Sequence, residues 1–185
     1  NENVYEITSG ATASSGALGG GSPRIQTTNT TEWFEQSYSS YRGFPAAITF
    51  HEDRLWFGGT PSQPDGIWGS KIGQYFNFDL GDASDDDSLD LDAATGVNNQ
   101  IRHLVSNRDL QVFASQSEFF LPSFNDRAIT PANAKISSQT PFGTGFVKPQ
   151  SVDGSTLFVQ ATGTAVREYV FTDRENAYTA GMVSL

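Results

Sequence analysis

The stretch from Arg42 to Phe78 constrains the fold more than any other feature, because it is the densest block of strand formers and turn formers in the chain. Short apolar runs bounded by glycine, proline or acidic pairs predict strands. We expect a hairpin across a polar Glu52-Asp53 tip, then two further strands, the last with three aromatic residues in four. Aromatic surface at this density predicts one sheet sealed against another. The expected strands are 47–51, 54–58, 67–70 and 75–78.

The rest of the chain continues in the same manner, so we predict an all-β fold. No long segment has a 3.6-residue apolar period, while 18 glycines and many Thr, Ser, Asn and Asp residues favour strands joined by tight turns. A chain of 185 residues is long enough to bury a sizeable core. We expect the end of the chain to fade out through a short helical turn at 175–178. The further expected strands are 101–105, 109–114, 118–121, 134–140, 155–160 and 165–171.

A loose repeat indicates how these strands are grouped. Segments beginning at Arg54, Asp109 and Ser155 each follow a polar tip, and their spacing of roughly 50 residues is typical of propeller blades built from four short strands. A β-sandwich would show similar spacing. We favour β-propeller-like blades of short antiparallel strands. Since about three blades cannot close a ring, we expect them to be part of a larger fold.

The domain organisation follows from composition. We predict that residues 1–32 form a strand plus a Gly/Ser-rich flexible segment, because 10–22 is almost wholly Gly, Ala, Ser and Thr. Residues 33–185 then form the propeller-like domain. The chain begins with Asn1 rather than Met, so we expect a processed or excised part of a longer protein. No apolar run approaches the roughly 18 residues of a membrane span, and we predict none.

Charge is unevenly distributed. The formal net charge of −10 argues against a nucleic-acid clamp. An acidic stretch, defined by its seven aspartates, carries no base between Lys71 and Arg102. Three interpretations are open: a solvated loop, a calcium-binding loop, or a surface that repels a polyanion. The spacing of the acids is not that of a calcium-binding loop. The members of the stretch are Asp79, Asp82, Asp85, Asp86, Asp87, Asp90 and Asp92.

Catalytic constellations are sparse. His51 and His103 are the only histidines, and each falls in or at the end of an expected strand, where a hydrogen-bonded structural role is the commoner outcome. The two lack metal-ligand spacing, no serine has a nucleophile-elbow context, and the chain has no cysteine. We therefore predict no catalytic residues, no metal site and no cofactor, and expect a protein that is not an enzyme.

An ordered series of residues runs from about Trp33 to the end of the chain. Its first part is Gly43-Phe44-Pro45, Ile48-Thr49-Phe50, Arg54-Leu55-Trp56-Phe57-Gly58-Gly59, Pro64, Trp68, Ser70, Gly73, Tyr75-Phe76-Asn77-Phe78 and Asp85-Asp86-Asp87. Its second part is Ile101-Arg102-His103-Leu104-Val105, Leu110 to Phe113, Glu118-Phe119, Thr130-Pro131, Gln139-Thr140, Gly143, Pro149 and Val166-Arg167-Glu168. The series resembles the tail nozzle proteins of short-tailed bacteriophages, also called tail tubular protein B, which are several times longer. The resemblance implies a propeller-bearing subunit of a sixfold tail ring, with no catalytic residues to carry over.

We therefore expect a structural virion protein of the phage tail, assembled in the cytoplasm of the bacterial host, that forms part of the DNA ejection channel. Expected partners are copies of itself in a ring, a hexamer by the resemblance, and tail proteins such as the adaptor and tail fibres. The genome would pass without specific binding, and the acidic stretch would face the channel. The rivals are a carbohydrate- or receptor-binding lectin-like propeller, which an exposed Trp33, Trp56 or Trp68 would favour, and a sialidase-like enzyme. The expected core is Leu55, Phe57, Trp68, Phe76, Leu110, Phe113, Leu157 and Val159.

Overall fold

The structure is a computed structural model that describes residues 38–93, 99–123 and 128–184. The chain divides into two units, residues 1–37 and 38–185, and the account that follows concerns the second. The strand and Gly/Ser-rich segment predicted within 1–32, together with Trp33, lie outside the described residues. Within those described, no helix has the length and apolar character needed to cross a membrane.

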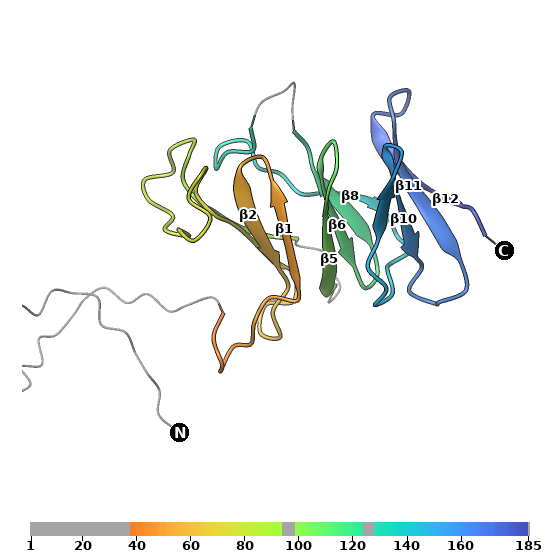
Figure 1. Cartoon of the computed structure of the whole chain (residues 1–185), viewed down its shortest axis with the longest axis horizontal. Helices are drawn as coiled ribbons and strands as arrows, with labels where there is room; N and C mark the ends of the chain where they lie inside the picture. Colours follow the sequence, from red (N-terminus) through yellow and green to blue (C-terminus); the bar gives the residue numbers. More distant parts are fainter. Residues whose placement is uncertain (1–37, 94–98, 124–127, 185) are drawn as a thin grey trace, which may run out of the picture. The chain divides into compact units, whose positions relative to one another are not determined.

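Among the described residues, twelve strands form three four-stranded sheets that follow one another along the chain (Figure 1). Neighbouring strands within each sheet are antiparallel. The first sheet contains β1 (Ala47–His51), β2 (Arg54–Gly58), β3 (Gly66–Gly69) and β4 (Leu89–Asp92). The middle sheet contains β5 (Ile101–Ser106), β6 (Leu110–Ala114), β7 (Glu118–Leu121) and β8 (Ser137–Thr140). The third sheet contains β9 (Gln150–Val152), β10 (Ser155–Val159), β11 (Val166–Thr172) and β12 (Ala177–Met182).

The all-β prediction is confirmed for the described residues, and the repeat marks real structural equivalents. Its three segments form β2, β6 and β10, the second strand of each sheet. The first hairpin has the predicted tip, where Glu52 and Asp53 have φ of 48° and 54°. Two successive left-handed residues are typical of the type I′ turn that matches the twist of a hairpin. These three sheets do not form a closed ring, so the all-β architecture is confirmed but a β-propeller is not.

The middle sheet is apolar on both faces, so it packs against both of the other sheets. One face carries Leu110, Val112 and Phe119 and joins Trp56 and Ile67 of the first sheet in one buried cluster. The opposite face contributes to a second, aromatic cluster with the third sheet. The members of that second cluster are Val105, Phe113, Phe120, Phe158, Tyr169, Tyr178 and Ala180. Alternation along β6 explains the two faces, because successive side chains of a strand point to opposite sides.

The middle and third sheets each pack an equivalent side against the sheet that precedes them in the chain. In β6 that side carries Leu110 and Val112, the second and fourth positions of the repeat. In β10 the same positions are Thr156 and Phe158, and Phe158 packs on the middle sheet. The two positions in β2 are Leu55 and Phe57.

This side of the first sheet, with Ile48, Phe50 and Trp68, is called the open face below, because no sheet covers it among the described residues. Tyr38 and Phe78 cover part of it, with ring centroids 5.6 Å and 5.3 Å from that of Phe57. Ile48 and Phe50 remain 60% and 59% exposed.

Several strand predictions are wrong in their details. Residues 75–78 form turn and loop rather than a strand, and the fourth strand of the first sheet is β4, inside the acidic stretch. The sequence Leu-Asp-Leu-Asp of β4 alternates between the core and solvent, which is the period of a half-buried strand. The strand β9 was not predicted. The helical turn predicted at 175–178 is wrong, because 175–176 end the turn of the β11–β12 hairpin and 177–178 begin the strand β12.

The core prediction holds for four of its eight residues, since Leu55, Trp68, Leu110 and Phe113 are buried. Phe76 is wrong, because it lies 94% exposed in the loop that replaces the predicted strand. Leu157 and Val159 are only half-buried, and Phe158 between them is 2% exposed. Alternation explains this error, because a shift of one residue moves a strand's side chains to its opposite face. Phe57 is also half-buried, since it lies on the open face.

Candidate functional site

The structure separates the acidic stretch into exposed acids and one anchoring acid. Asp79, Asp82, Asp85 and Asp86 lie exposed in the loop between β3 and β4, and Asp90 and Asp92 are exposed on β4. Asp87 is different, because it is 6% exposed and its Oδ1 lies 2.7 Å from Nζ of Lys71. Its Oδ2 accepts hydrogen bonds from the backbone N–H groups of Asp82 and Ser84. Asp87, one of the seven aspartates expected to face the channel, is therefore held inside the loop.

Arg54 holds the same loop from inside. Its guanidinium is buried and donates to the carbonyl oxygens of Ser70 and Asp87 at 2.6 Å and of Asp85 at 2.9 Å. Lys71 and the two backbone donors lower the pKa of Asp87, so it stays ionised. The loop is thus organised around two internal cations of the chain. No group of three or more His, Cys, Asp or Glu side chains in the described ranges is arranged to hold a metal.

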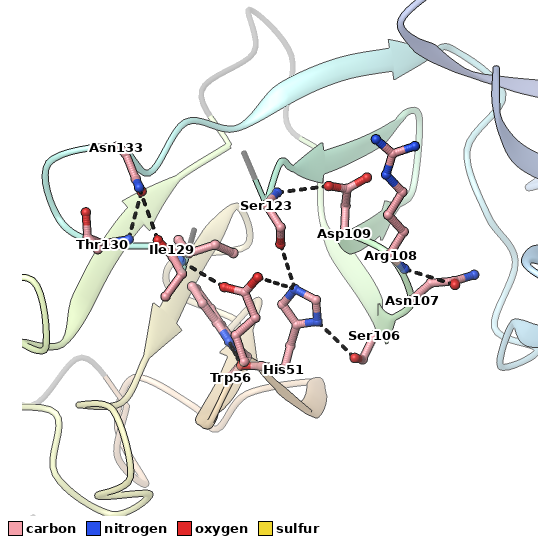
Figure 2. A network of polar contacts seen from close by, with 12 residues as sticks. His51, Trp56, Ser106, Asn107, Arg108, Asp109, Ser123, Ile129, Thr130 and Asn133 are labelled. Atoms are coloured by element: carbon pink, nitrogen blue, oxygen red, sulfur yellow. Dashed lines mark hydrogen bonds and ion pairs between the residues drawn. The ribbon is translucent and has the colours of Figure 1, made fainter. Parts of the chain in front are cut away.

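His51 connects the first sheet to the middle sheet (Figure 2). Its Nδ1 lies 2.9 Å from the Ser106 hydroxyl at the end of β5, and its Nε2 lies 3.4 Å from the Ser123 hydroxyl. Burial lowers the pKa of this histidine, while the carboxylates of Glu52 and Asp109 oppose that shift. The prediction of a hydrogen-bonded structural histidine agrees with this geometry. His103 is similar, with Nε2 3.2 Å from the carbonyl oxygen of Gly145.

The network contains a serine, a histidine and a glutamate, the residue types of a serine hydrolase. Their geometry, however, connects parts of the fold rather than forming a catalytic triad. The Oε1 of Glu52 lies 4.0 Å from Nε2 of His51, which is beyond hydrogen-bond reach. The other oxygen of Glu52 accepts a 2.8 Å hydrogen bond from the backbone N–H of Ile129. Glu52 therefore anchors the segment at Ile129 rather than orienting the imidazole, as a triad carboxylate would.

A shallow, open hollow of about 460 Å³ lies over the end of β1 and is a candidate binding site among the described residues. Phe50 and Tyr75 form aromatic walls with ring centroids 5.2 Å apart and planes at 84°. The Glu52-Asp53 turn supplies two carboxylates. The lining residues are Phe50, His51, Glu52, Asp53, Tyr75 and Ser106.

Only part of this site could be predicted from the sequence. The acidic tip and the aromatic density near Tyr75 are visible in the sequence, but the strand predicted for 75–78 placed Tyr75 elsewhere. Ser106 is brought to the hollow by the packing of β5 beside β1, which no local pattern contains. Of the three tryptophans whose exposure would favour a saccharide site, Trp56 and Trp68 are buried, at 0% and 4% exposed, and Trp33 lies outside the described residues.

A second buried titratable group lies between the middle and third sheets. Glu118 is 0% exposed, and its Oε2 accepts hydrogen bonds from the Thr140 hydroxyl at 2.5 Å and from the backbone N–H of Phe142 at 3.3 Å. Its Oε1 and the Tyr169 hydroxyl find no hydrogen-bond partner within the described ranges. Burial raises the pKa of Glu118 to about 7, against the effect of its hydrogen bonds and of Arg167.

Comparison with known proteins adds no assignment, because no protein-family model and no curated protein matches this chain.

Proposed function

We propose that this protein is a structural component of a bacteriophage tail, a nozzle or tail-tube ring subunit that forms part of the DNA ejection channel. The ordered residue series from Trp33 to the end of the chain supports the proposal through its resemblance to tail nozzle proteins. The proposal assigns no catalytic role to any residue. It places the protein in the virion tail after assembly in the host cytoplasm, in contact with copies of itself and with other tail proteins.

The observation that carries an assembly role is the open face of the first sheet. The equivalent sides of the middle and third sheets are buried against a preceding sheet, whereas Ile48 and Phe50 are more than half exposed. β1 is also an edge strand, and natural proteins rarely leave such edges uncovered. We expect a further sheet to cover this face in the assembled tail. The three sheets would then be consecutive blades of a propeller-like ring wall.

The exposed acids support the channel part of the proposal. Six of the seven aspartates are available to solvent, and acidic side chains repel DNA, which carries one charge per about 1.7 Å of duplex. Screening limits this repulsion to about 8 Å at physiological salt, so the effect requires a narrow channel. Asp87 has no part in it, because Lys71 neutralises it.

The test changes the open face without changing the core. The double variant Ile48→Asp with Phe50→Asp introduces two charges on exposed positions, so it should fold but fail to enter a ring. Val147→Asp is the matched control, since Val147 is 61% exposed but lies in the loop before β9. Analytical ultracentrifugation of the full-length protein and its amount in purified virions are the measurements. Assembly of the double variant at the wild-type level would refute the role of this face.

A further inference from the structure

The hollow over the end of β1 combines two aromatic rings with two carboxylates. Phe50 and Tyr75 are 59% and 38% exposed, so ring surface is available to a ligand. Among the described residues, the lining of the hollow contains no lysine or arginine. The guanidinium of Arg54, the nearest arginine in sequence, donates to three backbone carbonyls, and its charge interacts with that of Glu52.

The histidine in the hollow does not supply the missing positive charge. His51 is 6% exposed, and both its ring nitrogens lie beside serine hydroxyls. Burial favours its neutral form. Among the ion pairs of the described residues, Asp53 has none and Glu52 has only the 4.0 Å approach to His51. The carboxylate of Asp53 therefore lies beside two aromatic rings without an ion-pair partner among the described residues.

These features select among ligand classes. A metal ion would need more ligands, because no set of three suitable side chains exists in the described ranges, and hard cations take several oxygens. A neutral saccharide would use the rings but gain little from two charges. An organic cation uses both groups, since aromatic rings attract ammonium and guanidinium groups and carboxylates pair with them.

We propose that this hollow binds a lysine or arginine side chain of a partner protein. The ammonium or guanidinium group lies against Phe50 and Tyr75 and pairs with Asp53 and Glu52, while the Ser106 hydroxyl accepts a hydrogen bond from it. The proposal does not depend on the tail assignment, because it follows from the lining residues alone.

The test is an NMR titration of the ¹⁵N-labelled chain with N-acetyl-lysine-N-methylamide and its arginine counterpart. Both should bind in the millimolar range and shift the backbone amides of Glu52, Asp53 and Ser106. The norleucine counterpart, which has a similar chain length but no charge, should leave these amides unchanged. Rising salt should weaken the binding, as it weakens other exposed charge pairs.

Matched variants separate the carboxylates of the hollow from general surface charge. Glu52→Gln with Asp53→Asn should weaken lysine binding at least fivefold. If the double variant unfolds, the single variant Asp53→Asn replaces it in the same titration. Asp173→Asn with Glu175→Gln removes the same charge from the exposed β11–β12 turn and should have no effect. Equal binding of the norleucine compound, or equal weakening by both double variants, would overturn the proposal. Shifts at these amides with chitotriose but not with the charged compounds would assign a saccharide site instead.

Discussion

The buried carboxyl of Glu118 gives the sharpest prediction, because its pKa connects the stability of the joint between the middle and third sheets to pH. In the folded chain this pKa is raised from 4.5 to about 7. The folded state therefore keeps a proton that the unfolded state releases. The stabilisation is complete below pH 4.5 and is lost as the pH rises to about 7.

The magnitude follows from the size of the shift. One pKa unit corresponds to about 1.36 kcal/mol, so a shift of this size corresponds to about 3 kcal/mol. Between pH 4.5 and 8, the titration of Glu118 should therefore lower the free energy of unfolding of the wild type by about 3 kcal/mol. Glu118→Gln cannot ionise, so it should lack this decrease and should be more stable than wild type at pH 8.

Urea denaturation at several pH values from 4.5 to 8 measures this difference. Subtracting the curve of the variant from that of wild type removes the contribution of every group that the substitution leaves unchanged. Asp173→Asn is the control for loss of an exposed carboxylate, because the side chain of Asp173 is 92% exposed. A flat difference for Glu118→Gln would show that the pKa of Glu118 is the same in the folded and unfolded chain and that the reasoning is wrong.

Three other predictions test the fold and the proposed channel. Phe113→Ala should cost roughly 3–5 kcal/mol of stability, whereas Phe76→Ala should cost almost nothing by the same denaturation assay; similar losses would show that the core is misplaced. Asp87→Asn should lower the melting temperature measured by circular dichroism and Asp85→Asn should not, because only Asp87 pairs with Lys71 and caps the loop; equal melting temperatures would contradict the anchoring role. Replacing Asp82, Asp85 and Asp86 by Lys, with Asp87 retained, should slow DNA ejection from intact particles in a fluorescence assay, and ejection at the wild-type rate would remove the channel role.

Local pattern was sufficient for the strands that alternate strongly and end in clear turns. The hairpin of β1 and β2 and the strand β7 lie where the sequence predicts them, because turn residues bound them. Pattern failed where tertiary contacts decide. The aromatic run at 75–78 covers the open face from a loop, since Phe78 stacks on Phe57 with planes at 21°. β4 was missed because its aspartates dominate its composition.

The candidate sites depended even more on long-range contacts. The acidic stretch was found at once, but the different role of Asp87 follows from Lys71 and the fold of the loop. The hollow could not be predicted, because Ser106 is 55 residues from its partner His51. In the sequence, Glu118 is simply the first residue of a predicted strand, and nothing near it indicates burial. Tertiary packing between the middle and third sheets buries its carboxyl group.

The two apolar faces of the middle sheet also have a consequence for how the protein is made. Translation delivers the three sheets in order, at about 5–20 residues per second. The middle sheet can pack on the first as soon as it emerges from the ribosome. Its other face, with Phe113 and Phe120, then stays exposed until β10 and β11 have been synthesised. During those seconds the nascent chain presents an aromatic surface that chaperones or neighbouring chains on the same messenger RNA can bind.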